Sequence, residues 1–336
     1  MLKVGVIGCG YWGPNLVRNF VQLRRSEVVW VADLDESRLS HMEMLYPMVK
    51  TTRDYTEILS DSNVDVVAVA TPVRSHFKLA SEALSAGKHV FVEKPLAASV
   101  SEAKNLVTQA ASLAKKLMVG HTFLYTAAVQ KMKEIIDSGE LGEIYYVNTQ
   151  RLNLGLFQQD INVIWDLAPH DISIILYLLG QQPRVVSAIG ASHVNPSIED
   201  VAMVTLRFSG QLVAFIQSSW LDPDKIRKTT IVGSKKMMVY DDVQPAEKIR
   251  IYDKRVQKPK HYDTYAEFPY SYKYGDTLIP KIEGTEPLRT QLQHFLNCIE
   301  NGGDPLTDGA SGLSVVKILE AAQKSLQEGN AWVTID

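Results

Sequence analysis

The sequence contains little cysteine and no long run of apolar residues. Its 336 residues include two cysteines, Cys9 and Cys298, which are too few for a disulfide scaffold or a cysteine-rich zinc module. Such a low cysteine content fits a reducing compartment. No stretch of about 18 apolar residues occurs, so we expect no transmembrane helix.

The chain also lacks an excess of positive charge. Lysine and arginine total 35 against 38 aspartates and glutamates, which gives a formal net charge of -3. Proteins that bind a phosphate backbone usually carry the opposite balance. We therefore expect neither nucleic acid nor a membrane as a partner. The apolar stretch Val4–Ile7 leads into glycines rather than a small-residue cleavage site, so we expect no signal peptide and a cytoplasmic protein.

Length and composition predict a globular protein of about two domains. Apolar residues make up 46% and charged residues 22%, which is ordinary for a chain with a hydrophobic core. Over residues 1–120, short β-branched apolar runs alternate with helical patterns, which predicts an α/β domain with a doubly wound parallel sheet. We expect strands at 2–8, 28–32, 64–70, 89–93 and 117–119, and helices at 12–23, 75–86 and 99–115.

The pattern changes after residue 120, and residues 121–336 predict an α+β domain built on an open, mostly antiparallel sheet. Short glycine turns join its alternating runs, Ser209-Gly210 between 200–208 and 212–220, and Gly233-Ser234 between 228–232 and 236–240. We expect this domain to bind the substrate and to mediate oligomerisation. Its predicted helices span 127–138, Pro287 to about Gly302, and 310–328.

One segment, residues 254–275, combines lysines with many tyrosines. We interpret it either as a surface loop over the sheet or as a contact between subunits. Its tyrosines are Tyr262, Tyr265, Tyr270, Tyr272 and Tyr274.

A glycine-rich sequence, Gly8-Cys9-Gly10-Tyr11-Trp12-Gly13, follows the first predicted strand and opens the first predicted helix. In this G-x-G-x-x-G pattern the glycines permit a tight turn, a close approach of backbone to pyrophosphate, and close helix–strand packing. The helix N-terminus then binds the pyrophosphate. We therefore expect a Rossmann domain whose cofactor loop includes Tyr11 and Trp12; the alternative is a structural glycine turn.

Asp33 ends the second predicted strand, about 20 residues beyond Gly13. A carboxylate at this place accepts hydrogen bonds from the ribose 2′-hydroxyl and repels a 2′-phosphate. The nearest cation in the sequence is Arg38. These features favour NAD over NADP as the cofactor, although Asp33 could also cap the helix that follows.

Two further segments carry residues suited to catalysis. Glu93-Lys94-Pro95 follows a parallel strand at its carboxyl edge, where doubly wound sheets bind their ligands. Lys94 there would stabilise a substrate alkoxide as hydride leaves, or it is simply a solvated lysine. In the second segment, Asp166-Leu167-Ala168-Pro169-His170, proline favours a helix start near Pro169.

Such a turn would place Asp166 and His170 on one side. Histidine is the natural general base for oxidation of an alcohol, and a nearby carboxylate orients it and raises its basicity. A lysine with a depressed pKa could serve as the base instead. The alternatives are that Asp166 is a helix N-cap and that His170 is a packed polar residue.

These motifs together resemble those of the Gfo/Idh/MocA family of sugar and inositol dehydrogenases. The resemblance extends over essentially the whole chain. It implies oxidation or reduction at a ring carbon that bears a hydroxyl, no metal, and a homodimer or homotetramer built through the faces of the antiparallel sheet. The matching segments are Gly8 to Gly13, Ala70-Thr71-Pro72 with His76, Glu93-Lys94-Pro95, Ser138-Gly139-Glu140-Leu141-Gly142-Glu143, and Asp166 with His170.

The resemblance also implies roles for individual residues. In the expected reaction His170, oriented by Asp166, takes the hydroxyl proton while hydride passes to the nicotinamide, and Lys94 holds the oxyanion. These three residues form the expected catalytic group. The residues expected along the ribose and nicotinamide half of the cofactor are Thr71, Pro72, His76 and Glu93.

Two segments depart from the pattern common in the family. The sequence 162–165 lacks the paired glycines that often precede the aspartate, and 120–123 lacks an asparagine–arginine pair. Both stretches should border the substrate, which implies a substrate other than inositol or free glucose. The segments HTFLY, QRLNLG and NVIWDLAPHD look most like the branch that oxidises the 3-hydroxyl of UDP-N-acetylated hexoses, such as UDP-GlcNAc or its uronic acid, for amino-sugar or surface glycan synthesis.

Four residues in these segments are candidates for substrate binding. Arg151 and Asn153 would bind sugar or diphosphate oxygens, unless they belong to an ordinary surface strand. Trp165 would stack on a sugar or pyrimidine, or fill the core. Tyr125 ends the HTFLY segment.

Three other functions remain open from the sequence. The first is an inositol or free-sugar dehydrogenase. The second is an NADPH-dependent ketosugar reductase, which Asp33 argues against. The third is a catalytically silent NAD-binding sensor, which the presence of Lys94, Asp166 and His170 together argues against.

The cofactor assignment predicts that Asp33→Ala weakens NAD binding more than NADP binding, because only the ribose of NAD offers a free 2′-hydroxyl to the carboxylate. Titration of wild type and variant with each cofactor measures both losses. Equal losses for the two cofactors would contradict the assignment.

Overall fold

The computed structural model describes residues 1–257 and 271–335. The chain forms two compact units, of which the first consists of Met1–Tyr125 and Thr285–Glu320 and the second of Thr126–Gly284 and Ala321–Asp336. Each unit thus combines two stretches of sequence, whereas the sequence patterns alone suggest two continuous ranges. A helical pattern does not indicate which sheet the helix packs against, so periodicity cannot assign residues 285–320.

The first unit contains the doubly wound parallel sheet that the alternation of patterns predicts. Its strands pair in the order β3-β2-β1-β4-β5-β6, and all of these neighbours are parallel. The direction in which successive strands are added to the sheet reverses between β1 and β4. Doubly wound sheets bind their ligands next to this reversal, beyond the carboxyl ends of the strands. The strands are β1 (Leu2–Ile7), β2 (Ser26–Ala32), β3 (Lys50–Thr52), β4 (Val66–Val69), β5 (His89–Val92) and β6 (Leu117–Val119).

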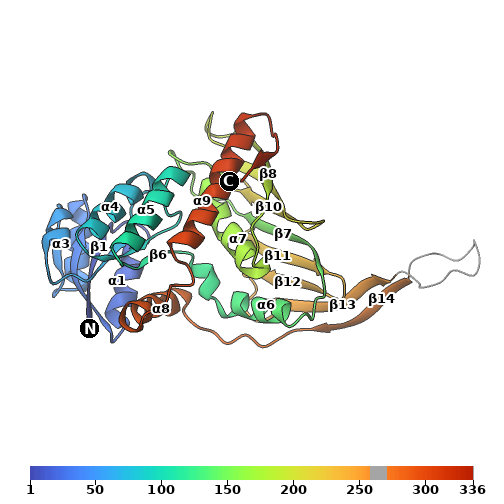
Figure 1. Cartoon of the computed structure of the whole chain (residues 1–336), viewed down its shortest axis with the longest axis horizontal. Helices are drawn as coiled ribbons and strands as arrows, with labels where there is room; N and C mark the ends of the chain where they lie inside the picture. The colour runs from blue at the N-terminus through green and yellow to red at the C-terminus, as the bar shows by residue number, and fades with distance from the viewer. Residues whose placement is uncertain (258–270, 336) are drawn as a thin grey trace, which may run out of the picture. The chain divides into compact units, whose positions relative to one another are not determined.

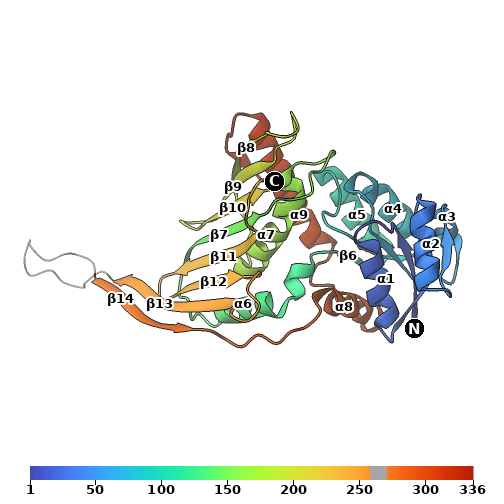
Figure 2. The same ribbon diagram turned by 180° about the vertical axis from the view of Figure 1, so that it is seen from behind.

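Helices cover both faces of this sheet. α4 and α5 lie in front of it in Figure 1, whereas α1 and α2 lie in front of it in Figure 2, which is seen from behind. At the start of α5, the N-cap Ser99 accepts the Glu102 N–H at 3.2 Å, and the Glu102 carboxylate accepts the N–H of Ala98, one residue before the cap, which is a variant of the predicted capping box. The elements are α1 (Gly13–Gln22), α2 (Glu36–Leu45), α3 (Thr56–Ser60), α4 (Val73–Ser85), α5 (Val100–Ser112), the 3-10 turn η1 (Thr122–Tyr125) and α8 (Pro287–Asn301).

The second unit contains an open, mostly antiparallel sheet. In the part of the chain that the structure describes, its strand order is β14-β13-β12-β11-β7-β10-β9-β8-β15, and among these neighbours only β7 and β10 are parallel. Both predicted glycine-turn hairpins are present. The strands are β7 (Ile144–Leu152), β8 (Val185–Ala191), β9 (Val201–Arg207), β10 (Val213–Ser219), β11 (Ile226–Gly233), β12 (Met237–Asp241), β13 (Ile249–Gln257), β14 (Ser271–Leu278) and β15 (Val333–Thr334).

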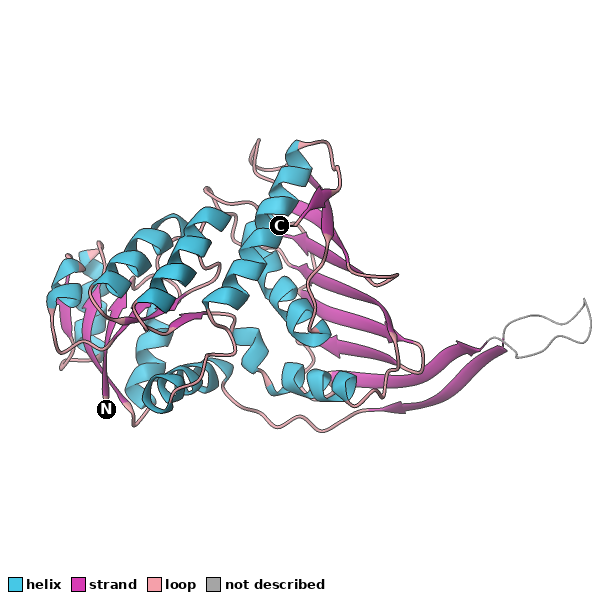
Figure 3. Ribbon diagram, in the orientation of Figure 1, coloured by secondary structure: helices cyan, strands magenta, loops and turns pink. Residues whose placement is uncertain are grey.

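Helices cover one face of this second sheet. α6 (Ala127–Asp137) and α7 (Val163–Leu179) lie in front of the strands in Figure 3, and Figure 2 shows the other face without a described helix over it. Alternate residues of β7 and β10 are buried, which is the pattern of strands with one covered face. α9 (Gly309–Gln327) begins in the first unit and ends in the second.

Helix α7 starts earlier than the sequence pattern indicates, at Val163 rather than near Pro169. Its N-cap is Asn162, whose side chain accepts the Trp165 N–H at 3.2 Å, so Asp166 is not the cap. Pro169 therefore lies inside the helix, where it cannot donate the usual bond to the carbonyl of Trp165. Burial of apolar residues along α7 against the sheet outweighs this local cost. The rule that places proline at a helix start does not take such burial into account.

At its described ends, the tyrosine-rich segment 254–275 forms strands rather than a surface loop. Its described ends belong to strands β13 and β14, which pair as an antiparallel hairpin. Tyr272 and Tyr274 lie on β14 and are exposed. Tyr262, Tyr265 and Tyr270 lie outside the described residues.

Candidate active site

The glycine-rich sequence forms the predicted turn between β1 and α1. Gly8 has a φ of +97°, which residues with a Cβ rarely adopt, and a Cβ at Gly13 would lie 2.0 Å from the Gly8 carbonyl oxygen. The atom nearest to a Cβ at Gly10 would be Arg38 Nη1 at 3.7 Å, so the backbone there is accessible to a ligand. In the described structure the N-cap Trp12 makes no side-chain cap, which leaves the helix start for a pyrophosphate. The loop therefore fits a dinucleotide.

Asp33 ties this loop to the end of β2. Its Oδ2 accepts the Cys9 N–H at 2.6 Å, and its Oδ1 accepts the Asp35 N–H at 2.9 Å. A carboxylate has about four lone-pair sites, so capacity remains for a ribose hydroxyl. Arg38 Nη1 lies 3.6 Å from Oδ2. Arg38 is thus close to Asp33 in space although it lies five residues further along the chain. The preference for NAD depends on repulsion between the Asp33 carboxylate and a 2′-phosphate, and the positive charge of Arg38 weakens that repulsion.

His76 connects the backbone beyond β4 with the backbone beyond β5. Its ring is 1% exposed, with Nδ1 2.8 Å from the Pro95 carbonyl oxygen and Nε2 2.8 Å from that of Thr71. Burial lowers the pKa of His76, and a neutral imidazole has one N–H for these two acceptors. Pro72 is the N-cap residue of α4. Contacts of Thr71, Pro72 and His76 with a cofactor stay predictions.

Three ionisable residues lie where β5 and β6 end. The parallel pairing of these strands places Gly120 beside Glu93, and a Cβ at Gly120 would lie 2.7 Å from Glu93 Oε2. Glu93 and His121 are both buried. Burial raises the pKa of Glu93 to about 7, whereas burial and, second, the charge of Lys94 lower the pKa of His121 to about 3. This edge therefore combines one lysine with two groups that burial drives toward their neutral forms.

Asp166 and His170 lie one turn apart on α7, in the second unit. Because α7 already begins at Val163, their spacing of i and i+4 puts them on the same helix face. The Asp166 Oδ2 accepts a hydrogen bond from Trp220 Nε1 at 3.0 Å. Trp220 follows β10 and is 1% exposed. The sequence patterns do not indicate this contact of Trp220, because no local pattern links it to Asp166, which is distant along the chain.

Arg151 is buried in an ion pair between β7 and α7. Its Nε lies 2.8 Å from Asp171 Oδ2 and its Nη2 lies 3.1 Å from Oδ1, which is the bidentate geometry that guanidinium and carboxylate favour. Both side chains are less than a tenth exposed. Arg151 therefore does not belong to an ordinary surface strand. Its contact with a substrate stays a prediction, and Asp171 is a partner that the sequence patterns do not reveal.

The other substrate candidates lie in different surroundings. Asn153 and Trp165 are half-buried in the second unit, and the Asn153 N–H donates to the Ser219 carbonyl at 3.2 Å. Tyr125 is buried at the end of η1 in the first unit, with its ring centroid 5.8 Å from that of His294. Binding of a substrate by these three residues stays a prediction.

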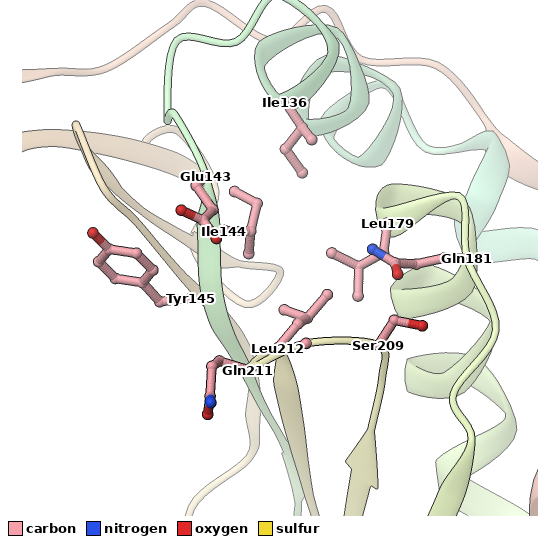
Figure 4. A pocket seen from close by; sticks show the side chains of 10 residues that line it. Ile136, Glu143, Ile144, Tyr145, Leu179, Gln181, Ser209, Gln211 and Leu212 are labelled. Carbon is pink, nitrogen blue, oxygen red and sulfur yellow. The ribbon is translucent and has the colours of Figure 1, made fainter.

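A cavity of about 430 Å³ lies elsewhere in the second unit, at the opposite end of α7 from Asp166. Apolar side chains of α6, α7 and the starts of β7 and β10 face one another across it, with Glu143 and Gln181 among the polar lining residues (Figure 4). Its lining includes none of the predicted site residues.

Two family models together match most of the chain. The model described as the oxidoreductase family, NAD-binding Rossmann fold, matches residues 2–121, and the model of the family's C-terminal alpha/beta domain matches residues 133–335. The chain belongs to the Gfo/Idh/MocA oxidoreductase family. Its Rossmann domain is an NAD-binding domain, and the residues of the glycine loop and Asp33 fit that cofactor.

Individual relatives of this Gfo/Idh/MocA oxidoreductase are distant. The chain is 25% identical over 338 residues to a myo-inositol 2-dehydrogenase of Thermotoga maritima, with 97% of both chains covered. Solved structures that share the fold include the following two. The UDP-N-acetylglucosamine 3-dehydrogenase GnnA from Acidithiobacillus ferrooxidans has a TM-score of 0.80, 22% identity, and 97% and 98% coverage. GenD2 from gentamicin A biosynthesis, in complex with NAD, has a TM-score of 0.83, 22% identity, and 100% and 96% coverage.

Among the described helices, none combines the length and the apolar character that crossing a membrane requires.

The burial of Glu93 predicts a pH-dependent stability for the apoprotein. Because burial raises its pKa from an ordinary value of 4.5 to about 7, the folded state binds this proton more tightly than the unfolded state. The Glu93 contribution to the free energy of unfolding is therefore full at low pH and falls as the pH rises from about 4.5 to 7, by at most about 3 kcal/mol.

Glu93→Gln should remove this fall, so that the variant gains stability relative to wild type between pH 5 and pH 8. Denaturant unfolding at both values measures the difference. Glu27→Gln, on the exposed side of β2, is the control and should change little. If the difference in free energy of unfolding between Glu93→Gln and wild type is the same at pH 5 and pH 8, Glu93 does not titrate between these values.

Proposed function

We propose that this protein uses NAD to oxidise a ring hydroxyl of a sugar. One observation carries the proposal: α7 holds Asp166 and His170 on one helix face, as a general base and its orienting carboxylate require. The first unit adds a dinucleotide loop and Lys94 at the carboxyl edge of its parallel sheet. A binding protein without catalysis would have no need for this combination.

The proposed roles follow from the chemistry of each group. The glycine loop and the start of α1 bind the pyrophosphate, and Asp33 binds the adenosine ribose; NAD, when bound, supplies the hydride acceptor. His170 accepts the proton of the hydroxyl, and Asp166 orients the imidazole. Lys94 donates a hydrogen bond to the same oxygen and stabilises its developing negative charge.

The proposed substrate is a UDP-N-acetylated hexose, such as UDP-GlcNAc or its uronic acid, with oxidation at the 3-hydroxyl. Support comes from the segments around Tyr125, Arg151 and Trp165, which look most like that branch of the family. GnnA, which shares the fold, is named for this chemistry. The second candidate is an inositol or free-sugar dehydrogenase, which the 25% identity to the myo-inositol 2-dehydrogenase favours.

We also propose that the protein acts as a homodimer or homotetramer joined through the uncovered face of the second sheet. Ile189 of β8 and Met203 of β9 are partners in register, and their side chains are 56% and 41% exposed. The neighbouring residues Ala188 and Val204 are buried on the opposite face. Exposed apolar side chains grouped in this way are typical of a surface that binds another protein.

Comparison of His170→Ala and Lys94→Ala tests the assignment of the base. If His170 is the base, His170→Ala loses the limb of the wild-type pH–rate profile that reports its deprotonation, and kcat falls by about 100-fold or more. Lys94→Ala should lower kcat and keep that limb. Rates across pH 5 to 10 with saturating substrate provide the measurement. A wild-type limb that survives in His170→Ala would remove His170 from the role.

A substrate panel tests the proposed reaction. Purified protein and NAD are incubated with UDP-N-acetylglucosamine, its 6-carboxylate, myo-inositol or glucose, and the absorbance of reduced cofactor is followed. A parallel series contains a 2-oxo acid, in case reduced cofactor stays bound and must be reoxidised. We expect turnover on a UDP-sugar alone. Turnover on inositol or glucose would support the second candidate, and tight NAD binding without turnover on any of these compounds would contradict the proposed substrates and favour a catalytically silent NAD-binding sensor.

A further inference from the structure

Trp220 is a buried aromatic residue with a defined polar contact. It follows β10, is 1% exposed, and donates its indole N–H to Asp166 Oδ2 at 3.0 Å. The indole nitrogen is only a donor, so its hydrogen bond selects an unprotonated carboxylate oxygen. A hydrogen bond between a buried donor and a charged acceptor is stronger than one between neutral groups. The contact therefore constrains which way the Asp166 carboxylate turns.

The backbone and ring of Trp220 are held from several sides. Its N–H donates to the Asp200 carbonyl, and its carbonyl accepts the Gly155 N–H, both at 2.9 Å. A Cβ at Gly155 would lie 2.9 Å from Trp220 Cδ1, so the chain at Gly155 packs directly on the indole. The ring of Phe157 lies 5.5 Å from that of Trp220, centroid to centroid. These contacts leave the indole little freedom to rotate away from Asp166.

The start of α7 is fixed independently of Trp220. The Asn162 side chain caps the helix and donates through Nδ2 to Glu199 Oε2 and to Gln323 Oε1, both at 2.8 Å. The backbone of Asp166 is thus anchored one turn into a capped helix. The cap does not determine the side-chain rotamer of Asp166. The hydrogen bond from the Trp220 indole N–H restricts that rotamer.

We propose that Trp220 is a positioning residue, which holds the Asp166 carboxylate in the orientation that the reaction uses. This inference rests on the proposed function, in which Asp166 orients His170. It also connects the segment beyond β7, through Gly155 and Phe157, to the catalytic helix. A residue of this kind acts on the chemical step without touching substrate or cofactor.

Trp220→Phe tests the proposal, because it removes the N–H and keeps a buried ring. We expect kcat to fall by about 10- to 100-fold, in line with loss of a charge-assisted hydrogen bond, while KM and the Kd of NAD change less than about twofold. Trp332→Phe makes the same chemical change at a half-exposed position of the second unit and should leave kcat unchanged. A wild-type kcat in Trp220→Phe would overturn the proposal.

A double-mutant cycle with Asp166→Asn separates this inference from the proposed function. If Trp220 acts through Asp166, adding Trp220→Phe to Asp166→Asn causes little further loss of kcat. Additive losses would overturn the positioning role. If Asp166→Asn itself keeps full activity, the proposed role of Asp166 fails, and the positioning role fails with it.

A spectroscopic measurement covers the case in which Trp220→Phe does not fold. The chain has five tryptophans, so protein labelled with 15N-tryptophan gives five indole N–H resonances. The Trp165→Phe background removes the indole next to Asp166 in sequence. In that background, Asp166→Asn should move one indole proton upfield, because its acceptor loses its charge. If no indole resonance moves, the hydrogen bond to Asp166 is absent in solution and the proposal is wrong.

Discussion

The close approach of α1 to the end of β1 determines where the first unit can bind a ligand. At Gly13 the helix passes so near the Gly8 carbonyl that a single methyl group would overlap it, which holds the start of α1 against the carboxyl edge of the sheet. The Asp33 carboxylate adds a second tie by bonding the Cys9 N–H to the end of β2. Because all strands of this sheet run in parallel, the residues after β4, β5 and β6 reach the same edge.

The second unit holds Asp166 and His170 on a helix whose buried face is mostly apolar. α7 buries its apolar residues against β7 and β10, and Asp171 pairs with Arg151 inside this packing. Removing one partner of such a pair would leave a buried charge uncompensated. The ion pair therefore ties α7 to β7 at Asp171, the residue next to His170.

The sequence predicts those features whose causes are local. The glycine turn, the Ser99–Glu102 capping box and the helix at Pro287 each follow from a few adjacent residues, and all are present. The start of α7 differs from the prediction because proline is the more distinctive helix-start signal, although the Asn162 cap is equally local. Trp220 and Asp171 could not be found at all, since each meets its partner only when separate strands and a helix pack together.

Burial at the edge of β5 and β6 shapes the chemistry available to Lys94. Burial drives Glu93 toward its neutral form, so it supplies less negative charge than a solvated carboxylate would, and burial also keeps His121 from adding a positive charge beside Lys94. A lysine ammonium is attracted to any neighbouring atom that becomes negative. A sugar hydroxyl is neutral in the ground state and develops negative charge only as its proton leaves. In the proposed reaction the interaction with Lys94 would therefore strengthen as the proton leaves, and an interaction stronger in the transition state than in the ground state is what accelerates a chemical step.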